Sequence, residues 1–243
     1  MSTLVPLLAV RAVPTGRTDR FFYSGMAIAV TAFVFIGFSR TYYLRSYFDG
    51  PKLTLLRVVH GTVFTAWMLF FVMQTLLVAA RRTAIHRRLG MAGAGLAVAM
   101  VLLGCVMAVQ AAREGRAPPG MEPRAFLAIP LFYMVVFAPL VAAGIYFRRD
   151  SEMHKRLMLL ATVSLAGAAA GRLPPTQTYG PLFFFGMVDL LVLAGPVYDL
   201  VTRHRIHRAY VWGGLLIILS QPLRLAVSGT TAWLAFANLL TGQ

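Results

Sequence analysis

The sequence predicts an all-α integral membrane protein, a bundle of about seven transmembrane helices, and three observations support this prediction. The 243 residues are 58% hydrophobic with a mean hydropathy of +0.71, and only 13% are charged, about half the share of a typical soluble domain. The runs 58–80, 89–112 and 125–147 contain no Asp, Glu, Lys or Arg. Each is long enough to cross a bilayer as a helix, which takes about 20 apolar residues.

The apolar runs divide in chain order into seven spans. The first is a lone helix after a basic tail, and the turn RRTAIHRRLG joins the second to the third. The loop REGRAPPGMEPR, with three prolines and two glycines, precedes the fourth. FRRDSEMHKRLM joins the fourth to the fifth, and TRHRIHRAY joins the sixth to the seventh. The expected spans cover 21–39, 55–80, 88–112, 125–147, 154–172, 181–202 and 209–231.

The fifth span is the shortest, because only 15 residues lie between Arg156 and Arg172. It crosses if those two arginines extend to opposite interfaces. Spans 3 and 5 are rich in glycine and alanine, which permits close helix packing. The chain is therefore expected to comprise a cytoplasmic tail over 1–20, a single transmembrane domain over 21–235 and a short tail over 236–243.

Lysine and arginine are unevenly divided between the two sides of the predicted bundle. Fourteen lie in the N-terminal tail and the three basic turns, and eight lie on the other side. Cytoplasmic loops carry such an excess, so we expect the N-terminus in the cytoplasm and the C-terminus in the periplasm of a bacterial plasma membrane. Because the net charge of +15 is concentrated in short connections, the expected partners are the lipid bilayer and its anionic headgroups, and not nucleic acid.

Each basic turn places a histidine at the start of the next helix. Three imidazoles suit zinc or iron, but the turns hold eleven lysines and arginines, whose charge disfavours a cation, so we expect no metal there. The expected role of the turns is to set topology and to contact anionic headgroups or another anion. The residues expected at that contact are His86, Arg87, His154, Lys155, His207 and Arg208.

Polar residues inside the spans predict a binding site, because ionisable groups in a membrane are costly and are either functional or paired. Asp189 and Arg224 lie about 20 and about 22 Å from the cytoplasmic edge on sequential helices, so we expect an ion pair that is either structural or part of a site. In span 2, His60, Trp67 and Gln74 form one stripe at helical spacing. We expect spans 2, 6 and 7 to wall a polar pocket that opens outward, with the ligand-binding residues His60, Trp67, Gln74, Arg172, Asp189, Gln221 and Arg224.

The segments HGTVFTAWMLFFVMQTLLVAARR, HRRLG and HKRLMLLA resemble a group of uncharacterised bacterial multi-pass membrane proteins, from about residue 20 to 235. That resemblance implies a membrane bundle and a bacterial host, and it carries no activity. There is also a loose likeness to haem-b membrane cytochromes, which place histidines near helix ends. A bis-histidine haem needs two histidines at one depth, and only His60 is on the outer side. The likeness therefore implies, at most, a haem with His60 as its single axial histidine.

Three functions are open from the sequence. The first is binding or transport of a small anionic or amphipathic ligand that meets Arg172, Arg224 and His60, with Asp189 holding Arg224 when the site is empty. The second is a redox protein with haem or quinone beside the span 2 stripe. The third is an assembly or scaffold subunit without a site. No nucleophile–base or metal-ligand constellation stands out, which disfavours an enzyme.

Overall fold

The computed structural model of the chain describes residues 16–50 and 52–242, and only the backbone of Gln177. Most of the expected N-terminal tail, residues 1–15, therefore lies outside the described residues. The described chain is helical and contains no strand, as expected for an all-α bundle. Six of its helices are long and apolar enough to cross a membrane, which makes this a multi-pass membrane protein whose outer faces contact lipid.

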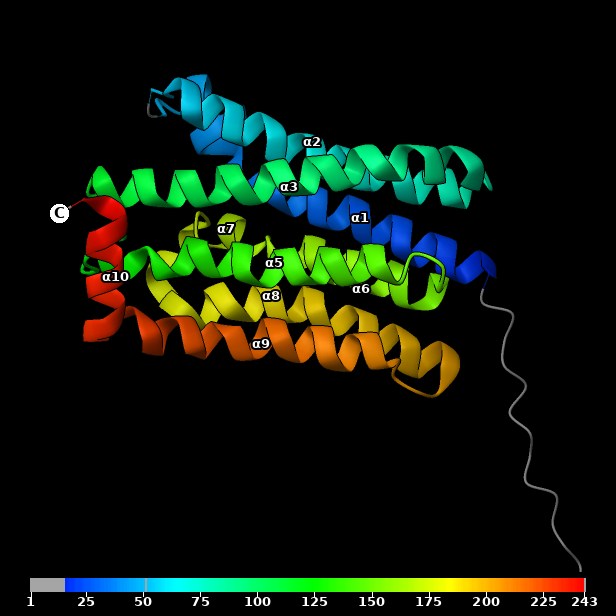
Figure 1. Cartoon of the computed structure of the whole chain (residues 1–243). Coiled ribbons are helices and arrows are strands. Elements are labelled where there is room, and N and C mark those ends of the chain that lie inside the picture. The colour runs from blue at the N-terminus through cyan, green and yellow to red at the C-terminus, as the bar shows by residue number, and fades with distance from the viewer. Residues whose placement is uncertain (1–15, 51, 243) are drawn as a thin grey trace, which may run out of the picture.

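Seven helical segments run between the same two ends of the bundle (Figure 1). The three arginine-rich turns and the start of α1 lie together at one end, which we call the basic end, and the remaining connections lie at the opposite end. The predicted spans therefore match the structure in number and order. The seven segments are α1 (Gly16–Phe38), α2 (Leu55–Ala79), α3 (Thr83–Arg113), α5 (Ala128–Tyr146), α6 and α7 (Ser151–Ser164 and Gly167–Ala170), α8 (Pro174–Arg203) and α9 (Arg208–Ser228).

Short elements complete the connections. A π-helix, Ser39–Tyr43, and a 3-10 helix, Arg45–Tyr47, follow α1 and lead toward α2. A single turn, α4 (Pro123–Phe126), precedes α5. Glu122 caps its start, because the Glu122 side chain accepts a hydrogen bond from the backbone N–H of Ala125. Such a cap satisfies one of the free donors at a helix start.

The fifth segment differs from the other six because it is interrupted. Its backbone turns at Leu165 and Ala166, whose N–H groups bond to carbonyls three residues earlier, so α6 ends and α7 begins one short turn later. This segment is nevertheless the most enclosed, and every residue from Leu159 to Gly167 is buried. Small side chains let its neighbours approach closely, as the composition of span 5 predicts.

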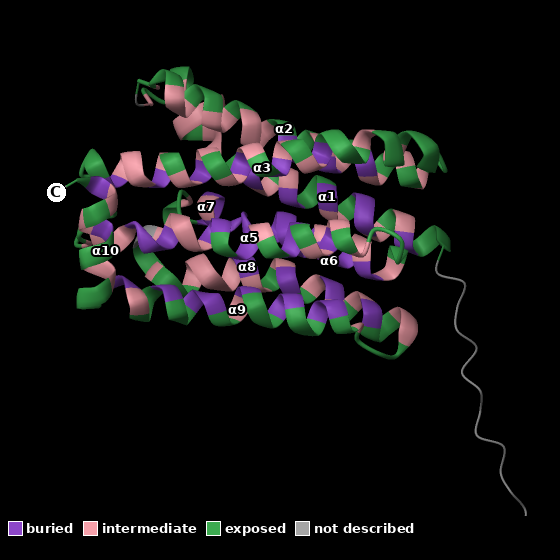
Figure 2. Cartoon of the chain, viewed as in Figure 1, coloured by how far each residue is buried: buried purple, intermediate pink, exposed green. Residues whose placement is uncertain are grey.

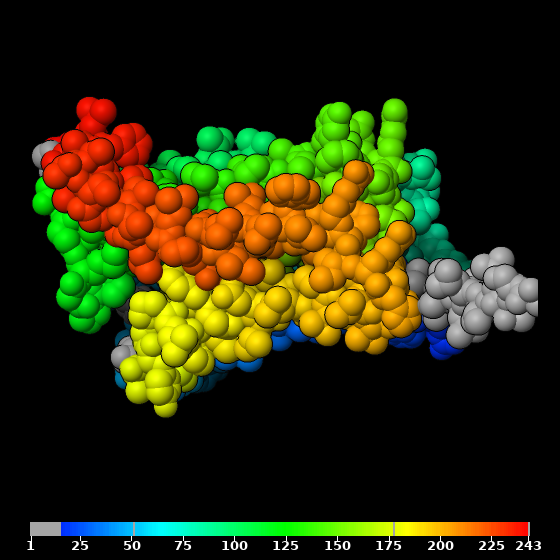
Figure 3. All heavy atoms as spheres, turned by 90° about the horizontal axis from the view of Figure 1, so that it is seen from below, coloured from blue at the N-terminus to red at the C-terminus, as the bar shows by residue number. Residues whose placement is uncertain are grey.

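The helices form three layers around α5 and α6 (Figure 1). Helices α1, α2 and α3 pack on one side of this central pair, while α8 and α9 pack on the other and form one broad face of the molecule (Figure 3). Buried residues concentrate in the middle layer, and the outer faces of α2, α3 and α8 are exposed (Figure 2). An exposed apolar exterior is the expected arrangement for a bundle whose solvent is lipid.

A last helix, α10 (Thr231–Thr241), lies across the opposite end of the bundle, roughly perpendicular to the others (Figure 1). Thr230 caps its start, and Gly242, with φ of 72°, ends it in the left-handed region that favours glycine. Arg113 donates two hydrogen bonds to the last carbonyls of α10, and the Trp233 indole N–H donates to the carbonyl of Arg124. The sequence analysis placed residues 236–243 in a tail and did not anticipate this helix.

Gly37→Ala should destabilise the protein, because Gly37 lets α1 approach α7. An added Cβ would lie 2.6 Å from the carbonyl oxygen and 2.8 Å from the Cα of Ala169, and neither backbone atom can turn aside. We expect a loss of about 1–3 kcal/mol in the free energy of unfolding, as for other overpacked sites. Gly25→Ala on the same helix is the control, because nothing lies within 4 Å of its added Cβ. Equal melting temperatures for the two variants in detergent would contradict the close approach.

Candidate functional site

A small cavity lies between α5, α7, α8 and α9. It holds about 10 Å³ of free space, which is room for roughly one water molecule. Aromatic and aliphatic side chains make up most of its wall, and four polar side chains face it. The lining consists of Tyr133 of α5, Ser164 and Gly167 near the α6–α7 break, Phe184, Phe185 and Val188 of α8, and Ile217, Gln221 and Arg224 of α9.

Arg224 supplies the cavity's charge. Its side chain folds back along α9, so that Nε donates to the Ser220 carbonyl at 3.1 Å and Nη2 donates to the Ser220 hydroxyl at 2.7 Å. Long helical side chains point toward the helix N-terminus, which explains this local contact. The residue is 3% exposed. None of the ion pairs among the described residues includes Arg224.

Aromatic rings take the place of a carboxylate beside this guanidinium. The Arg224 Cζ atom lies 4.8 Å from the Tyr133 ring centroid and 6.0 Å from those of Phe132 and Phe185. Ring faces attract a cation, but more weakly than a buried carboxylate does. The Tyr133 hydroxyl, packed against Gly167, is buried beside the Arg224 guanidinium, which is its nearest polar neighbour, and it makes no well-aligned hydrogen bond among the described residues. The cavity therefore combines a guanidinium that has no carboxylate partner among the described residues with a tyrosine hydroxyl beside it.

The expected ion pair between Asp189 and Arg224 is absent from the described structure, which corrects the sequence analysis. Asp189 instead accepts a hydrogen bond from Gln221 Nε2 at 2.7 Å. Gln221 stands one turn before Arg224 on the same face of α9, so it meets Asp189 while Arg224 turns back to Ser220. The two ionisable residues lie on neighbouring helices as expected, and Gln221 connects the carboxylate to the wall of the cavity.

The backbone of α8 breaks immediately before the residues that cover the cavity. Gly180 has φ of 55° and ψ of −138°, a combination that disfavours any side chain. Pro181 follows, and it has no N–H to continue the helical hydrogen bonds. Phe184 and Phe185, which line the cavity, come in the first turn after this break. The part of α8 that covers the cavity is thus connected to the first turn of the helix through one residue, Gly180, whose backbone is not helical.

The span 2 stripe does not reach this cavity. Helix α2 packs against α1 and α3, and the central layer separates it from α8 and α9 (Figure 1). Trp67 is buried, donates to the Thr162 hydroxyl at 3.3 Å and meets Phe137 edge-to-face. The pocket expected between spans 2, 6 and 7 is therefore replaced by one between α5, α7, α8 and α9, because α5 and α6 occupy the middle of the bundle.

The other expected ligand-binding residues are also dispersed. His60 stacks on Phe64, with ring centroids 4.1 Å apart, and its Nδ1 is buried without a hydrogen-bond partner in the described part of the chain. Gln74 donates to the carbonyl of His86 at 3.4 Å, near the basic end. Arg172 lies with its Cζ atom 4.0 Å from the Phe38 ring centroid, at the opposite end. Of the seven residues, the structure brings together Asp189, Gln221 and Arg224.

A cluster of six charged side chains holds the basic end together, and the sequence analysis did not find it. The ion cluster comprises Asp19 of α1, Glu152, Lys155 and Arg156 of α6, and Asp199 and Arg203 of α8. Three carboxylates balance three cations, so the cluster is neutral. It joins all three layers of the bundle, because α1, α6 and α8 belong to different layers.

The pair at the centre of the ion cluster is Arg156 with Asp199, and both side chains are 0% exposed. Arg156 donates from Nη2 at 2.6 Å and from Nε at 2.9 Å to the two carboxylate oxygens, a bidentate geometry that gives strong, oriented bonds. Asp199 also accepts from the backbone N–H of His207 at 3.1 Å. Arg203 donates to Asp19 and to Glu152, both at 2.6 Å.

The three histidines of the basic turns lie apart from one another except for one pair. The His86 and His154 rings are 6.0 Å apart between centroids, and His154 Nδ1 is 2.8 Å from the carbonyl of Gly144. His207 begins α9, where its Nδ1 accepts from the N–H of Ala209. Burial, and then the charge of Arg156, lower the pKa of His207, which favours the neutral ring that such a cap requires.

Ten described arginines at the basic end have no carboxylate partner. The acidic residues there are committed elsewhere: three belong to the ion cluster, and Asp150 caps the start of α6. The ten arginines are Arg17, Arg20, Arg81, Arg82, Arg87, Arg88, Arg148, Arg149, Arg205 and Arg208. Lys155, which was expected at a headgroup contact, is instead bound to Asp19 and Glu152.

Comparison with known proteins finds no matching family model, no similar curated protein and no similar solved structure.

Proposed function

We propose that this membrane protein binds the anionic group of a small ligand at Arg224, in the half of the bundle that faces away from the cytoplasm. The observation that carries the proposal is a buried guanidinium that has no ion pair among the described residues. Arginine stays protonated in proteins, and an unpaired buried charge is costly. A bound anion removes that cost, and the Tyr133 hydroxyl and Ser164 beside it offer further polar contacts.

The ligand needs more room than the closed cavity has. With about 10 Å³ free, the site accommodates a group of about the size of water, so a carboxylate with an attached body requires Phe184 and Phe185 to move. The break at Gly180 and Pro181 gives α8 a place to bend without losing helical hydrogen bonds elsewhere. An amphipathic ligand would then place its anionic end at Arg224 and its apolar part against the aromatic rings.

The proposal includes the protein's placement. The basic end faces the cytoplasm of a bacterial plasma membrane, because cytoplasmic loops carry the excess of lysine and arginine. Ten described arginines without carboxylate partners at that end support contact with anionic headgroups. Each arginine near a charged membrane surface contributes on the order of 1 kcal/mol to binding. The cavity and α10 then lie toward the periplasm.

Thermal unfolding in detergent with chloride, acetate or benzoate as the probe tests the site. At a probe concentration of 100 times the Kd, stabilisation is about 2.7 kcal/mol, and it should saturate in the wild type. Arg224→Gln should abolish the probe-dependent shift. Arg224→Lys should retain part of it, because lysine keeps the charge but loses the planar fork of donors. The control is Arg88→Gln, an exposed arginine at the basic end. A shift of equal size in wild type and Arg224→Gln would contradict the proposal.

A further inference from the structure

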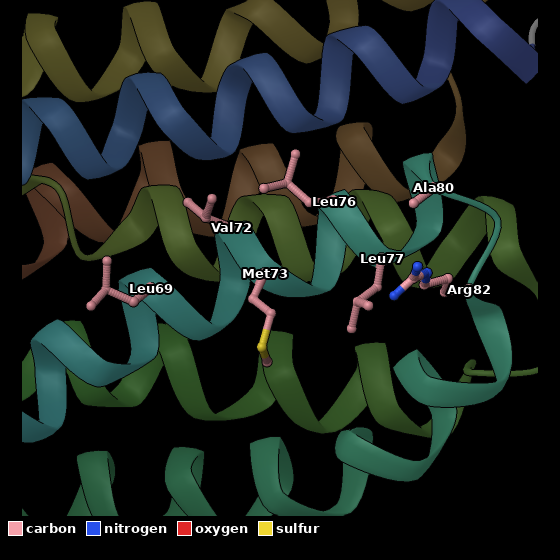
Figure 4. Close-up of a pocket in the computed structure, with 7 residues that line it drawn as sticks. All are labelled: Leu69, Val72, Met73, Leu76, Leu77, Ala80 and Arg82. Carbon is pink, nitrogen blue, oxygen red and sulfur yellow. The ribbon is translucent and has the colours of Figure 1, made fainter.

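A shallow apolar groove runs along the outer face of α2 and ends at the basic end of the bundle (Figure 4). Its volume is about 420 Å³, far larger than that of the Arg224 cavity. The apolar members recur at steps of three and four residues, so they form one stripe on the helix. The lining residues are Leu69, Val72, Met73, Leu76, Leu77, Ala80 and Arg82.

The groove has the length of one bilayer leaflet. Leu69 and Ala80 are 11 residues apart on a continuous helix, which corresponds to about 17 Å at 1.5 Å per residue. Half of the hydrocarbon core is about 15 Å thick. A groove that begins at the basic end therefore covers the depth that an acyl chain of the same leaflet occupies.

The charge at the groove's mouth is positive and has no anion from the protein. Arg82 is exposed and lines the groove, and its guanidinium extends back beside Leu77 (Figure 4). It forms no ion pair among the described residues. Arg20 of α1 donates to the carbonyl of Ala79 at 3.3 Å, which brings a second guanidinium to the same turn. An apolar groove with guanidinium groups at one end is complementary to an amphipathic anion.

We propose that this groove binds one anionic phospholipid, with an acyl chain along α2 and the phosphate at Arg82. The site is separate from the Arg224 cavity and rests only on the proposed placement of the bundle in the membrane. A neutral phospholipid offers the same chain but no net negative charge to Arg82 and Arg20, so selectivity for the anionic headgroup is the property that distinguishes a built site from ordinary lipid contact.

The test is a titration of the whole, detergent-purified protein with phosphatidylglycerol or phosphatidylcholine that carry identical acyl chains, followed by native mass spectrometry. We expect the first phosphatidylglycerol to bind more tightly than phosphatidylcholine. Arg82→Gln should weaken that binding about fivefold, the effect of one basic residue near an anionic lipid. Met73→Trp, which fills the groove, should weaken binding of both lipids. Arg88→Gln should weaken binding of this first lipid less than Arg82→Gln does, because Arg88 lies outside the groove and meets the headgroups of other lipids at the basic end.

Three results would overturn the inference. Equal losses in Arg82→Gln and Arg88→Gln would show diffuse attraction to the basic end. Unchanged binding in Met73→Trp would show that the chain does not occupy the groove. Equal affinity for the two lipids would show that the headgroup is not recognised. Inorganic phosphate at the same concentrations should not compete, because it lacks the chain. Arg224→Gln should leave phosphatidylglycerol binding intact, which separates this outcome from that of the proposed anion site.

Discussion

Asp199→Asn should lower the free energy of unfolding by about 3 kcal/mol, the lower end of the usual cost of breaking a buried ion pair, because Arg156 keeps Glu152, at 2.7 Å, as a partner. The substitution keeps the shape of the side chain but removes the charge that Arg156 binds through two hydrogen bonds, at 2.6 and 2.9 Å. Arg156 stays charged, and its side chain is fully buried. Unfolding in mixed micelles of mild detergent and SDS, followed by circular dichroism, measures the loss.

A double-mutant cycle separates this pair from the rest of the ion cluster. Asp199→Asn combined with Arg156→Gln should cost less than the sum of the single changes, because each single change already removes the contact between the two side chains. The control cycle is Asp189→Asn with Arg224→Gln, whose members make no ion pair and meet Gln221 and Ser220 instead. Its coupling should be near zero. Additive losses at Asp199 and Arg156 together with strong coupling at Asp189 and Arg224 would contradict the arrangement of both sites.

Trp67→Ala should be the second most damaging single change. Trp67 is 1% exposed and fills the space between α2 and the central layer, where it packs on Phe137 and donates to Thr162. In a soluble core this truncation costs about 3–5 kcal/mol. In lipid the unfolded helices remain in an apolar medium, so moving the indole out of the core costs no transfer free energy from apolar medium to water. The cost of the empty space that the indole leaves behind, about 2–3 kcal/mol, remains.

Trp212→Ala provides the matched control, because Trp212 lies on α9 and is 73% exposed. Its loss should change stability by no more than about 0.5 kcal/mol. Trp67→Phe should fall between the two, since it retains an aromatic ring but loses the N–H donor. A small effect at Trp67 that is no greater than that at Trp212 would show that the space closes without the indole, and that the packing between α2 and the central layer is adaptable.

The sequence predicts the transmembrane segments well, because the length of an apolar run and the arginine-rich turn that ends it are local signals. All seven spans correspond to helical segments, and the three arginine-rich turns share one end. The interruption of α6 at Leu165 and Ala166 has only a weak signal, since Gly167 follows it directly but other glycines lie within uninterrupted helices such as α3. The helix α10 has signals, Thr230 before it and Gly242 after it, that can be read from the sequence once capping residues are sought.

Side-chain partners are harder to predict than spans because depth along a helix says nothing of rotation about its axis. Asp189 and Arg224 are on neighbouring helices at similar depth, yet Gln221 takes the carboxylate. The ion cluster was missed for a different reason. Lys155, Arg156 and Arg203 were counted among the basic residues that set topology, and although Glu152 is near Lys155 and Arg156 in the chain, the contacts that join different helices are made between distant residues. Asp19 is 136 residues from Lys155 and 184 from Arg203.

Those separations have a consequence for how the protein is made. A ribosome delivers the chain to the membrane N-terminus first, so α1 is inserted with Asp19 long before α6 and α8 exist. Arg156 likewise waits for Asp199, which is 43 residues later. The ion cluster is complete only when α8 has joined the five segments before it. A chain that lacks α8 therefore leaves Asp19 and Arg156 with fewer of the charged partners that hold the basic end together in the complete bundle.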